Sequence, residues 1–283
     1  MSQKPLKLET LAVHAGTQVD PASKAVIPGI FLSTTYEREI DGSYATPFVY
    51  SRIDNPNRHS LEEALAALEG AKHCASFSSG MAAIHTLFSC LKAGDHVVIT
   101  DDLYHGTRHV LNKVMQRWQL SASYVDMTDL NKVTSAIQDN TSLIYTETPT
   151  NPLLKIADIA ELGKIAKAHQ LMLAVDSTWT TPIIQRPLTL GADVVIHSTT
   201  KYLGGHSDIL GGALLLNDDY LLTKVRELQM LGGAVPSPFE CWLLHRSLRS
   251  LPYRMRGHCE NASQIASALA QDKRIQRVHY PGL

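Results

Sequence analysis

Short apolar runs alternate with amphipathic helical patterns along the middle of the chain, and this alternation constrains the fold more than any other feature. The apolar runs lie at 96–100, 143–146, 171–175, 194–196 and 213–216. Helical patterns lie between them, for example at 129–137 and 156–170. Apolar strands that are buried on both faces and alternate with helices indicate a mostly parallel sheet covered by helices. The sequence therefore predicts an α/β fold.

The regions on either side of this pattern differ from it. Residues 1–55 are rich in turn-forming proline and glycine, and we expect them to form an N-terminal arm before a large domain at 56–250. A mostly helical stretch with a break at Pro252 comes next, and then a strand-like run at 275–280 near the end of the sequence. We therefore expect 251–283 to be the start of a small C-terminal domain that is incomplete.

The composition excludes several classes of partner. The 26 basic and 27 acidic residues leave a net charge of -1, so the protein lacks the strong field that attracts nucleic acid or an anionic membrane. The four cysteines form no Cys-x-x-Cys pair, which predicts free thiols. Residues 1–10 lack the apolar stretch of a signal peptide, and no run of 18 apolar residues occurs. We expect a cytoplasmic protein whose partners are small molecules or other subunits.

Two charged residues follow strands of the predicted sheet, at the edge where α/β folds bind ligands. Asp176 comes directly after the run 171–175, and Lys201 follows the run 194–196 through a short segment of hydroxyl residues. Alone, Asp176 could equally cap a turn, and a lone lysine is usually a surface charge. Together they suit pyridoxal phosphate, because a lysine amine can hold it as a Schiff base while a carboxylate keeps its ring nitrogen protonated.

Nearby residues are suited to hold the phosphate of this cofactor. Ser198 and Thr200 offer hydroxyl groups beside Lys201, and the glycines that follow allow a phosphate to approach the backbone. A Ser-Ser-Gly-Met segment that includes Gly80 and Met81 opens an expected helix. A helix N-terminus favours a phosphate through its free N–H groups and its dipole, although an ordinary helix start has the same composition.

Four sequence motifs, some of which contain the residues above, also resemble those of a known family. They are Ser-Ser-Gly-Met-Ala-Ala at 78–83, Glu-Thr-Pro-Thr-Asn-Pro at 147–152, Val-Asp at 175–176, and Ser-Thr-Thr-Lys-Tyr at 198–202 with Gly-Gly-His-Ser-Asp at 204–208. In this order they closely resemble the Cys/Met metabolism family of pyridoxal-phosphate enzymes, which process cystathionine. The resemblance extends from about Val13 to Leu283. It implies the type I fold of pyridoxal-phosphate transferases, whose large domain contains a mostly parallel, seven-stranded sheet.

The resemblance also implies roles for single residues. Tyr104 is expected to stack on the cofactor ring and to take part in proton transfer. Tyr50 and Arg52 are expected to reach the cofactor phosphate of a neighbouring subunit, where a guanidinium suits phosphate oxygens. Asn151 is expected near the cofactor hydroxyl and the substrate carboxylate, although it could also cap a turn before Pro152. The resemblance therefore implies a homo-oligomer, a dimer of dimers whose subunits share active sites.

Expected substrate contacts are Tyr104, Asn151, Arg108 and Glu147. Some residues depart from the family pattern. Asn57 replaces the usual threonine after Asn-Pro, and His105 replaces the usual glycine after Tyr104. At positions 108 and 109 this chain has Arg108 followed by His109, whereas the family commonly has its arginine at the second of the two positions. Whether Arg108 contacts the substrate is therefore open. His105 and His109 have the spacing of a metal-binding pair, but without a nearby carboxylate motif we expect no metal.

We expect γ-elimination on cystathionine or a related sulfur amino acid, a reaction of trans-sulfuration in which Lys201 and Tyr104 are catalytic. The segment 232–238 resembles the γ-lyase branch of the family. Cystathionine γ-synthase and β-lyase are alternatives within the family. An inactive, truncated relative that serves as a binding or remnant protein is an alternative of another class. In the family the small domain supplies an arginine for the substrate carboxylate, and we expect this domain to be incomplete here. A nicotinamide dehydrogenase is a weaker alternative, since no Gly-x-Gly-x-x-Gly motif follows a strand.

Overall fold

A computed structural model describes residues 6–283 and divides the chain into two compact units. The first unit comprises the described part of Met1–Cys90 together with His197–Ser250. The second unit comprises Leu91–Ile196 and Leu251–Leu283. Each unit therefore combines segments that are far apart in the sequence.

Seven strands of the described residues form a mixed sheet in the order β1-β7-β6-β5-β4-β2-β3. Their bounds are β1 (His73–Phe77), β2 (His96–Thr100), β3 (Ser121–Val125), β4 (Thr141–Glu147), β5 (Met172–Asp176), β6 (Val194–His197) and β7 (Gly212–Leu216). In the second unit β3, β2, β4, β5 and β6 pair in parallel, whereas β1 and β7 of the first unit pair antiparallel. The predicted α/β fold with a mostly parallel, seven-stranded sheet is confirmed.

The strands that the sequence predicted are the apolar ones. All five are present, and their bounds differ from the predicted ones by at most two residues. The two strands that were missed, β1 and β3, are the first and last in the sheet order. The residues of β3 are small or polar and stay partly exposed, and β1 mixes His73 and Ser76 with apolar residues. The partly exposed β3 therefore carries a weak apolar signal, whereas β1 is largely buried and its polar residues interrupt the apolar run.

The described residues also form ten α-helices, five in each unit. In the first unit they are α1 (Leu8–His14), α2 (Pro56–Glu69), α3 (Gly80–Ser89), α8 (Asp219–Gly232) and α9 (Pro238–Leu248). In the second unit they are α4 (His105–His109), α5 (Leu130–Ser135), α6 (Ile159–Ala168), α7 (Thr181–Ile184) and α10 (Leu251–Gln271), with short helical turns at Val110–Val114, Met115–Trp118 and Pro187–Leu190. None of the helices in the described part of the chain has both the length and the apolar character needed to cross a membrane.

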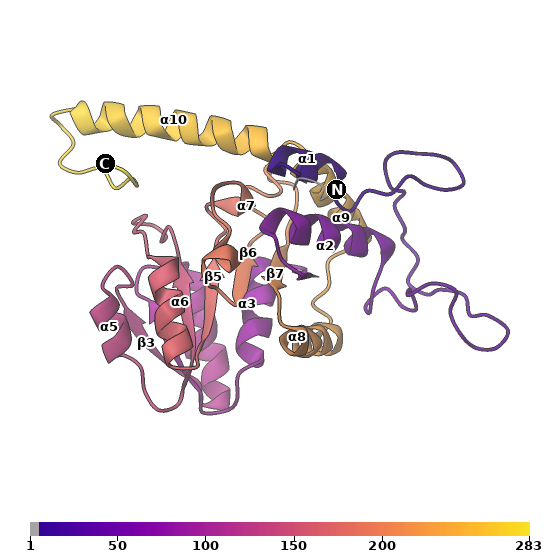
Figure 1. The fold of residues 1–283 in the computed structure, drawn as a ribbon, viewed down its shortest axis with the longest axis horizontal. Coiled ribbons are helices and arrows are strands. Elements are labelled where there is room, and N and C mark those ends of the chain that lie inside the picture. The colour runs from indigo at the N-terminus through magenta and orange to yellow at the C-terminus, as the bar shows by residue number, and fades with distance from the viewer. Residues whose placement is uncertain (1–5) are drawn as a thin grey trace, which may run out of the picture. The chain divides into compact units, whose positions relative to one another are not determined.

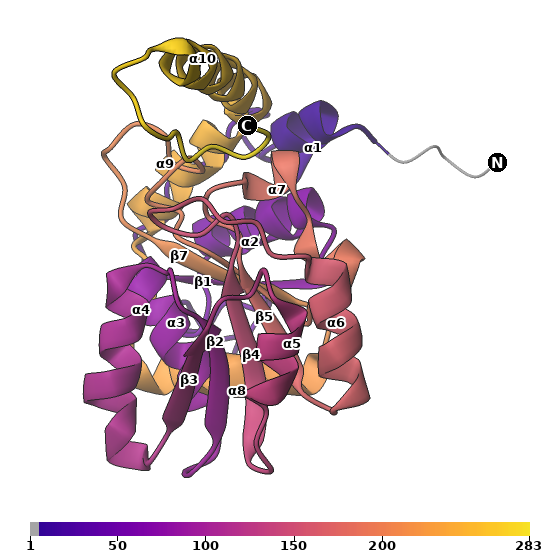
Figure 2. The same ribbon diagram turned by 90° about the vertical axis from the view of Figure 1, so that its left-hand side faces the viewer.

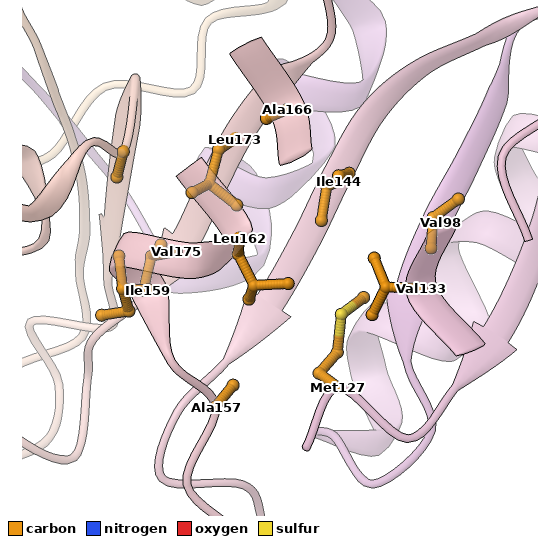
Figure 3. Packing of buried hydrophobic residues seen from close by; sticks show 11 residues of the cluster. Val98, Met127, Val133, Ile144, Ala157, Ile159, Leu162, Ala166, Leu173 and Val175 are labelled. Atoms are coloured by element: carbon orange, nitrogen blue, oxygen red, sulfur yellow. The ribbon is translucent and has the colours of Figure 1, made fainter. Parts of the chain in front are cut away.

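The core of the second unit lies between its parallel strands and the helices α5 and α6. Val98, Ile144 and Leu173 of the strands pack with Val133 of α5 and Leu162 of α6, all fully buried. Figures 1 and 2 show both helices on the same side of the strands, and Figure 3 shows the side chains gathered between them. Each such burial contributes about 1.5–3 kcal/mol, so this core stabilises the packing of α5 and α6 on the strands.

The described part of the arm, residues 6–55, is irregular apart from α1 and an isolated bridge between Thr35 and Tyr50. Asn57 at the start of α2 accepts a hydrogen bond from the N–H of Phe31 at 2.8 Å and donates one to the carbonyl of Gly29 at 2.7 Å. The side-chain amide of Asn57, which replaces the threonine usual in the family, therefore connects the arm to α2.

The C-terminal stretch agrees only in part with expectation. α9 ends at Leu248 and α10 begins at Leu251, which confirms a break near Pro252 in the first turn of a helix, where proline is tolerated. The prediction of a strand at 275–280 is wrong, because these residues are irregular. A strand needs a partner for its backbone hydrogen bonds, and no strand of the described residues pairs with this run. The division into 1–55, 56–250 and 251–283 stays a prediction.

Candidate active site

The segment that carries Lys201 forms tight turns in the first unit, directly after β6. The N–H of Gly205 donates to the carbonyl of Lys201 at 2.7 Å, and the N–H of Gly204 donates to that of Thr199 at 2.9 Å. The hydroxyl of Thr200 accepts from the N–H of Gly211 at 3.0 Å and donates to the carbonyl of the same residue at 3.2 Å. Thr200 therefore fixes the lysine segment against the start of β7, while Lys201 itself is exposed.

The predicted phosphate-binding helix start meets this segment within the first unit. A Cβ atom added at Gly80, the first residue of α3, would lie 3.0 Å from the Cβ and 3.1 Å from the Oγ of Ser198. A Cβ at Gly212 would lie only 2.3 Å from the carbonyl oxygen of Ser79. Both glycines are needed for this close approach. The structure therefore brings together Gly80 and Ser198, two of the residues predicted to bind phosphate.

The donors at this point fit a phosphate. The side chain of Ser79 caps α3 by accepting from the N–H of Ala82 at 3.0 Å. The first N–H groups of a helix have no acceptor within the helix, so those that follow Ser79, including that of Met81, are suited to an anion beside the Ser198 hydroxyl. A helix N-terminus beside a segment that carries a serine and a lysine supplies the donors that pyridoxal phosphate requires.

The carboxylate predicted to serve the cofactor ring lies in the second unit. Asp176 is the last residue of β5, where its Oδ1 accepts from the N–H of Thr178 at 3.1 Å and from the hydroxyl of Thr178 at 2.6 Å. Its Oδ2 accepts from the hydroxyl of Tyr145 at 3.3 Å. The contacts with Thr178 form the turn cap that was the alternative role of Asp176. Capping and binding a ring are compatible, because these contacts orient the carboxylate.

Lys201 and Asp176 follow adjacent strands. Asp176 pairs with Ile196 of β6, and the N–H of Ser177 donates to the carbonyl of Ile196 at 3.0 Å. Lys201 lies five residues after Ile196 in the chain. The prediction that the two charged residues follow neighbouring strand ends is therefore confirmed.

Glu147 and Tyr104 are joined in the second unit. Oε2 of Glu147 accepts from the backbone N–H of Tyr104 at 2.8 Å. Burial, and then the charge of Asp176, raise the pKa of Glu147 to about 9. The side chain of Tyr104 is open, since this residue is 46% exposed. Glu147 thus anchors the backbone of a residue expected to stack on the cofactor.

The loop that bears Asn151 is held by Asp102, a residue that the sequence analysis missed. Oδ2 of Asp102 accepts from the hydroxyl of Thr150, and from the N–H of Leu153 at 3.0 Å. Asn151 lies between these two contacts and is partly buried. Asp102 follows the apolar run 96–100 closely, so applying the strand-end criterion to that run as well would have identified it.

The remaining predicted site residues have local partners. The guanidinium of Arg108 lies 4.0 Å from the ring centroid of Tyr124 and donates to the carbonyl of Asp101. Arg52 donates to the carbonyl of Met230 at 2.8 Å. It also lies over the ring of Tyr50, 5.4 Å from its centroid. The pair is therefore together, and its contact with a neighbouring subunit stays a prediction.

The two histidines after Tyr104 lie on the short helix α4. The ring centroids of His105 and His109 are 4.0 Å apart. The charge of His105 lowers the pKa of His109. Within residues 6–283 no group of three or more His, Cys, Asp or Glu side chains is arranged to hold a metal ion.

Comparison with known proteins identifies the class to which these features belong. The family described as Cys/Met metabolism PLP-dependent enzyme matches residues 9–283. The chain belongs to this family of pyridoxal-phosphate enzymes. The suspected family, the enzymatic nature of the protein and its cofactor are thereby confirmed.

Individual relatives have three different names. The chain is 48% identical over 274 residues to a probable cystathionine gamma-synthase of Herpetosiphon aurantiacus, a match that covers 97% of this chain and 86% of the relative. It is 42% identical to a cystathionine beta-lyase of Lactococcus lactis, over 98% of this chain and 72% of the relative. A crystal structure of cystathionine gamma-lyase from Lactobacillus plantarum, complexed with L-serine, matches with a TM-score of 0.95 at 39% identity, over 98% of this chain and 72% of that chain. The names agree on cystathionine chemistry and differ in the reaction.

Proposed function

We propose that this enzyme catalyses γ-elimination on cystathionine or a related sulfur amino acid. The observation that carries the proposal is the close approach of Gly80 to Ser198, three residues before Lys201, because it brings a helix start suited to a phosphate next to the segment that carries the lysine. Membership in a family of pyridoxal-phosphate enzymes supports it. The resemblance of 232–238 to the γ-lyase branch favours this reaction over the others.

In this proposal the first unit binds the phosphate and supplies the lysine. The N–H groups of Gly80 and Met81 and the hydroxyls of Ser198 and Thr200 would hold the phosphate. The hydroxyl of Thr200 also accepts from the N–H of Gly211, which keeps the segment in place. Nζ of Lys201 would hold the cofactor covalently and would be freed when the substrate amine binds. Bound pyridoxal phosphate supplies an electron sink for the bond broken at the substrate α-carbon. The released Lys201 amine then carries protons between substrate carbons.

Other residues are proposed to serve the ring and the substrate. The carboxylate of Asp176, oriented by Thr178 and Tyr145, would keep the ring nitrogen of the cofactor protonated. Tyr104 stacks on the ring and exchanges a proton with the substrate. Tyr104, Asn151 and Arg108 are the proposed contacts of the substrate. Glu147, also expected to contact the substrate, is proposed to act on it through Tyr104, whose backbone N–H it holds.

We also propose that the protein is a cytoplasmic homo-oligomer, a dimer of dimers, in which Tyr50 and Arg52 reach the phosphate of a neighbouring subunit. The arm supports this proposal because it exposes several large apolar side chains. These are Val26, Ile27, Ile30, Phe31, Leu32 and Ile40. Such side chains gather at interfaces between subunits. The four cysteines, all free thiols, agree with a reducing compartment.

Product analysis tests the reaction. The purified holoenzyme is incubated with cystathionine, and a γ-lyase yields cysteine, 2-oxobutyrate and ammonia. Homocysteine, pyruvate and ammonia contradict the proposal and identify a β-lyase. A preference for making cystathionine from cysteine and an activated homoserine ester identifies a γ-synthase, the candidate favoured by the relative with 48% identity.

The same assay tests the alternative of an inactive relative. That alternative predicts cofactor absorbance without turnover of any of these substrates. Turnover by the 283-residue chain rejects it.

A further inference from the structure

Two buried carboxyl groups end neighbouring strands of the second unit. Glu147 is the last residue of β4, Asp176 is the last residue of β5, and the two are register partners. Register partners on adjacent strands project from the same face of a sheet. Glu147 is 5% exposed and Asp176 is 7% exposed. Two such carboxyl groups cannot both be negative without a large cost, so one of them keeps a proton.

The hydrogen-bond donors decide which carboxyl group is charged. Asp176 accepts from the N–H and hydroxyl of Thr178 and from the hydroxyl of Tyr145. Glu147 accepts from the N–H of Tyr104. Donors stabilise the ionised form of a carboxyl group, and Asp176 has more of them. The negative charge therefore belongs on Asp176 and the proton on Glu147.

We propose that Glu147 is a positioning residue that stays protonated in the folded enzyme, where it anchors the Tyr104 backbone and leaves Asp176 as the single negative charge of the pair. The functional meaning rests on the proposed function, in which Tyr104 and Asp176 serve the cofactor. A neutral Glu147 can hold the Tyr104 backbone at the end of β4 without placing a second negative charge beside Asp176.

The surroundings of Glu147 agree with this assignment. Burial and the charge of Asp176 raise its pKa to about 9, and Asp102 on the loop after β2 acts in the same direction. Tyr145, two residues earlier on β4, has a pKa raised well above its ordinary value by burial, Asp176 and Glu147, so it stays neutral. Lys155, a cation of the loop after β4, pairs with Asp101 at 3.2 Å and with Asp126 at 3.1 Å.

The infrared spectrum of the apoprotein of residues 1–283 tests the protonation state directly. A protonated carboxyl group gives a carbonyl stretching band that a carboxylate lacks. We expect this band at pH 7 in the wild type and in the control Glu161→Gln, whose exposed glutamate pairs with Lys164. Glu147→Gln should remove it. Identical carboxylic-acid absorption in the wild type and Glu147→Gln at pH 7 would overturn the proposal.

A titration covers the case in which Glu147→Gln does not fold. In the wild type the carboxylic-acid band should disappear as the pH rises through about 9. A spectrum without a band that titrates in this range contradicts the proposal. Both spectra are recorded without cofactor or substrate. An enzyme that keeps the band but fails to turn over cystathionine therefore contradicts the proposed function alone.

Substitutions in the holoenzyme separate positioning from proton transfer. Glu147→Gln keeps a neutral oxygen that can accept from the Tyr104 N–H, so kcat/KM should stay within about threefold of the wild type. Glu147→Leu leaves that N–H without its acceptor, and a loss of about tenfold or more is expected. An equally large loss in Glu147→Gln would show that Glu147 transfers a proton or acts as a charge, contrary to the proposal.

Discussion

The two units position their functional groups in different ways. In the first unit, close backbone packing at Gly80 and Gly212 holds the lysine segment. In the second unit, hydrogen bonds among buried side chains hold Asp176, Glu147 and Tyr104. The first arrangement is sensitive to volume, since one methyl group exceeds the available space. The second is sensitive to protonation, because its members are acids in a buried environment.

The largest effect is expected from removing the lysine of the first unit. Lys201→Ala should abolish the visible absorbance of the covalently held cofactor and lower kcat by about a thousandfold or more, since general acid–base catalysis alone contributes about 10²–10⁴-fold. Absorbance spectra and turnover measure both effects. Lys164→Ala, which removes a lysine whose side chain is 72% exposed, is the control and should match the wild type. Full activity in Lys201→Ala would remove the role assigned to the first unit.

A methyl group at Gly80 tests whether volume controls the first unit. The added Cβ would meet Ser198 at 3.0 Å, and overpacking of this kind costs about 1–3 kcal/mol. Gly80→Ala should therefore weaken cofactor binding by about tenfold to a hundredfold, as measured by titration of the apoprotein. Gly257→Ala in α10 is the matched control, because a Cβ there meets nothing within 4 Å. The control should stabilise the protein by about 0.5–1 kcal/mol. Equal cofactor affinities of the two variants would contradict the comparison.

The pH dependence of stability tests the second unit. Its raised pKa means that folded Glu147 keeps its proton between the ordinary value of 4.5 and about 9, whereas the unfolded chain releases it. This residue therefore lowers the free energy of unfolding by about 1.4 kcal/mol for each pH unit in that window, and the full stability is present only below it. The free energy of unfolding of Glu147→Gln should exceed that of the wild type, and this excess should grow by about 1–3 kcal/mol from pH 6 to pH 8. Urea unfolding at both pH values measures the difference, and parallel curves would contradict the raised pKa.

A smaller effect is expected at Asp102, which sharpens the description of the second unit. Asp102→Ala removes the acceptor of Thr150 and Leu153, a change worth about 0.5–1.5 kcal/mol. Because Asn151 lies on the same loop, KM should rise about threefold to tenfold while cofactor absorbance stays unchanged. Asp102→Asn retains an acceptor and should have a smaller effect. An unchanged KM in Asp102→Ala would separate this loop from the substrate.

The fold could be predicted from the sequence where buried strands consist of continuous apolar residues. The inner strands are continuous apolar runs, so their existence and approximate bounds follow from composition alone. The edge strands β1 and β3 lack such runs and were missed. The expected strand at 275–280 failed for the opposite reason, since its residues have the composition of a strand but no pairing partner among the described residues.

The site could be predicted where residues directly follow strands. Lys201 and Asp176 were found by this criterion, and the approach of Gly80 to Ser198 joins two segments that were predicted separately. The contacts of Asp176 with Tyr145 and of Glu147 with Tyr104 could not be predicted. They join residues 31 and 43 positions apart, and such pairs depend on the register between strands, which the composition of either strand does not determine.

Reduction of the holoenzyme with borohydride, followed by proteolysis and mass spectrometry, tests the central claim most directly. Borohydride converts the bond between lysine and cofactor into a stable amine, so the peptide that carries the pyridoxyl mass identifies the attachment site. The account predicts this mass on Lys201. Its appearance on another lysine, or on none, would contradict the assignment of the active site.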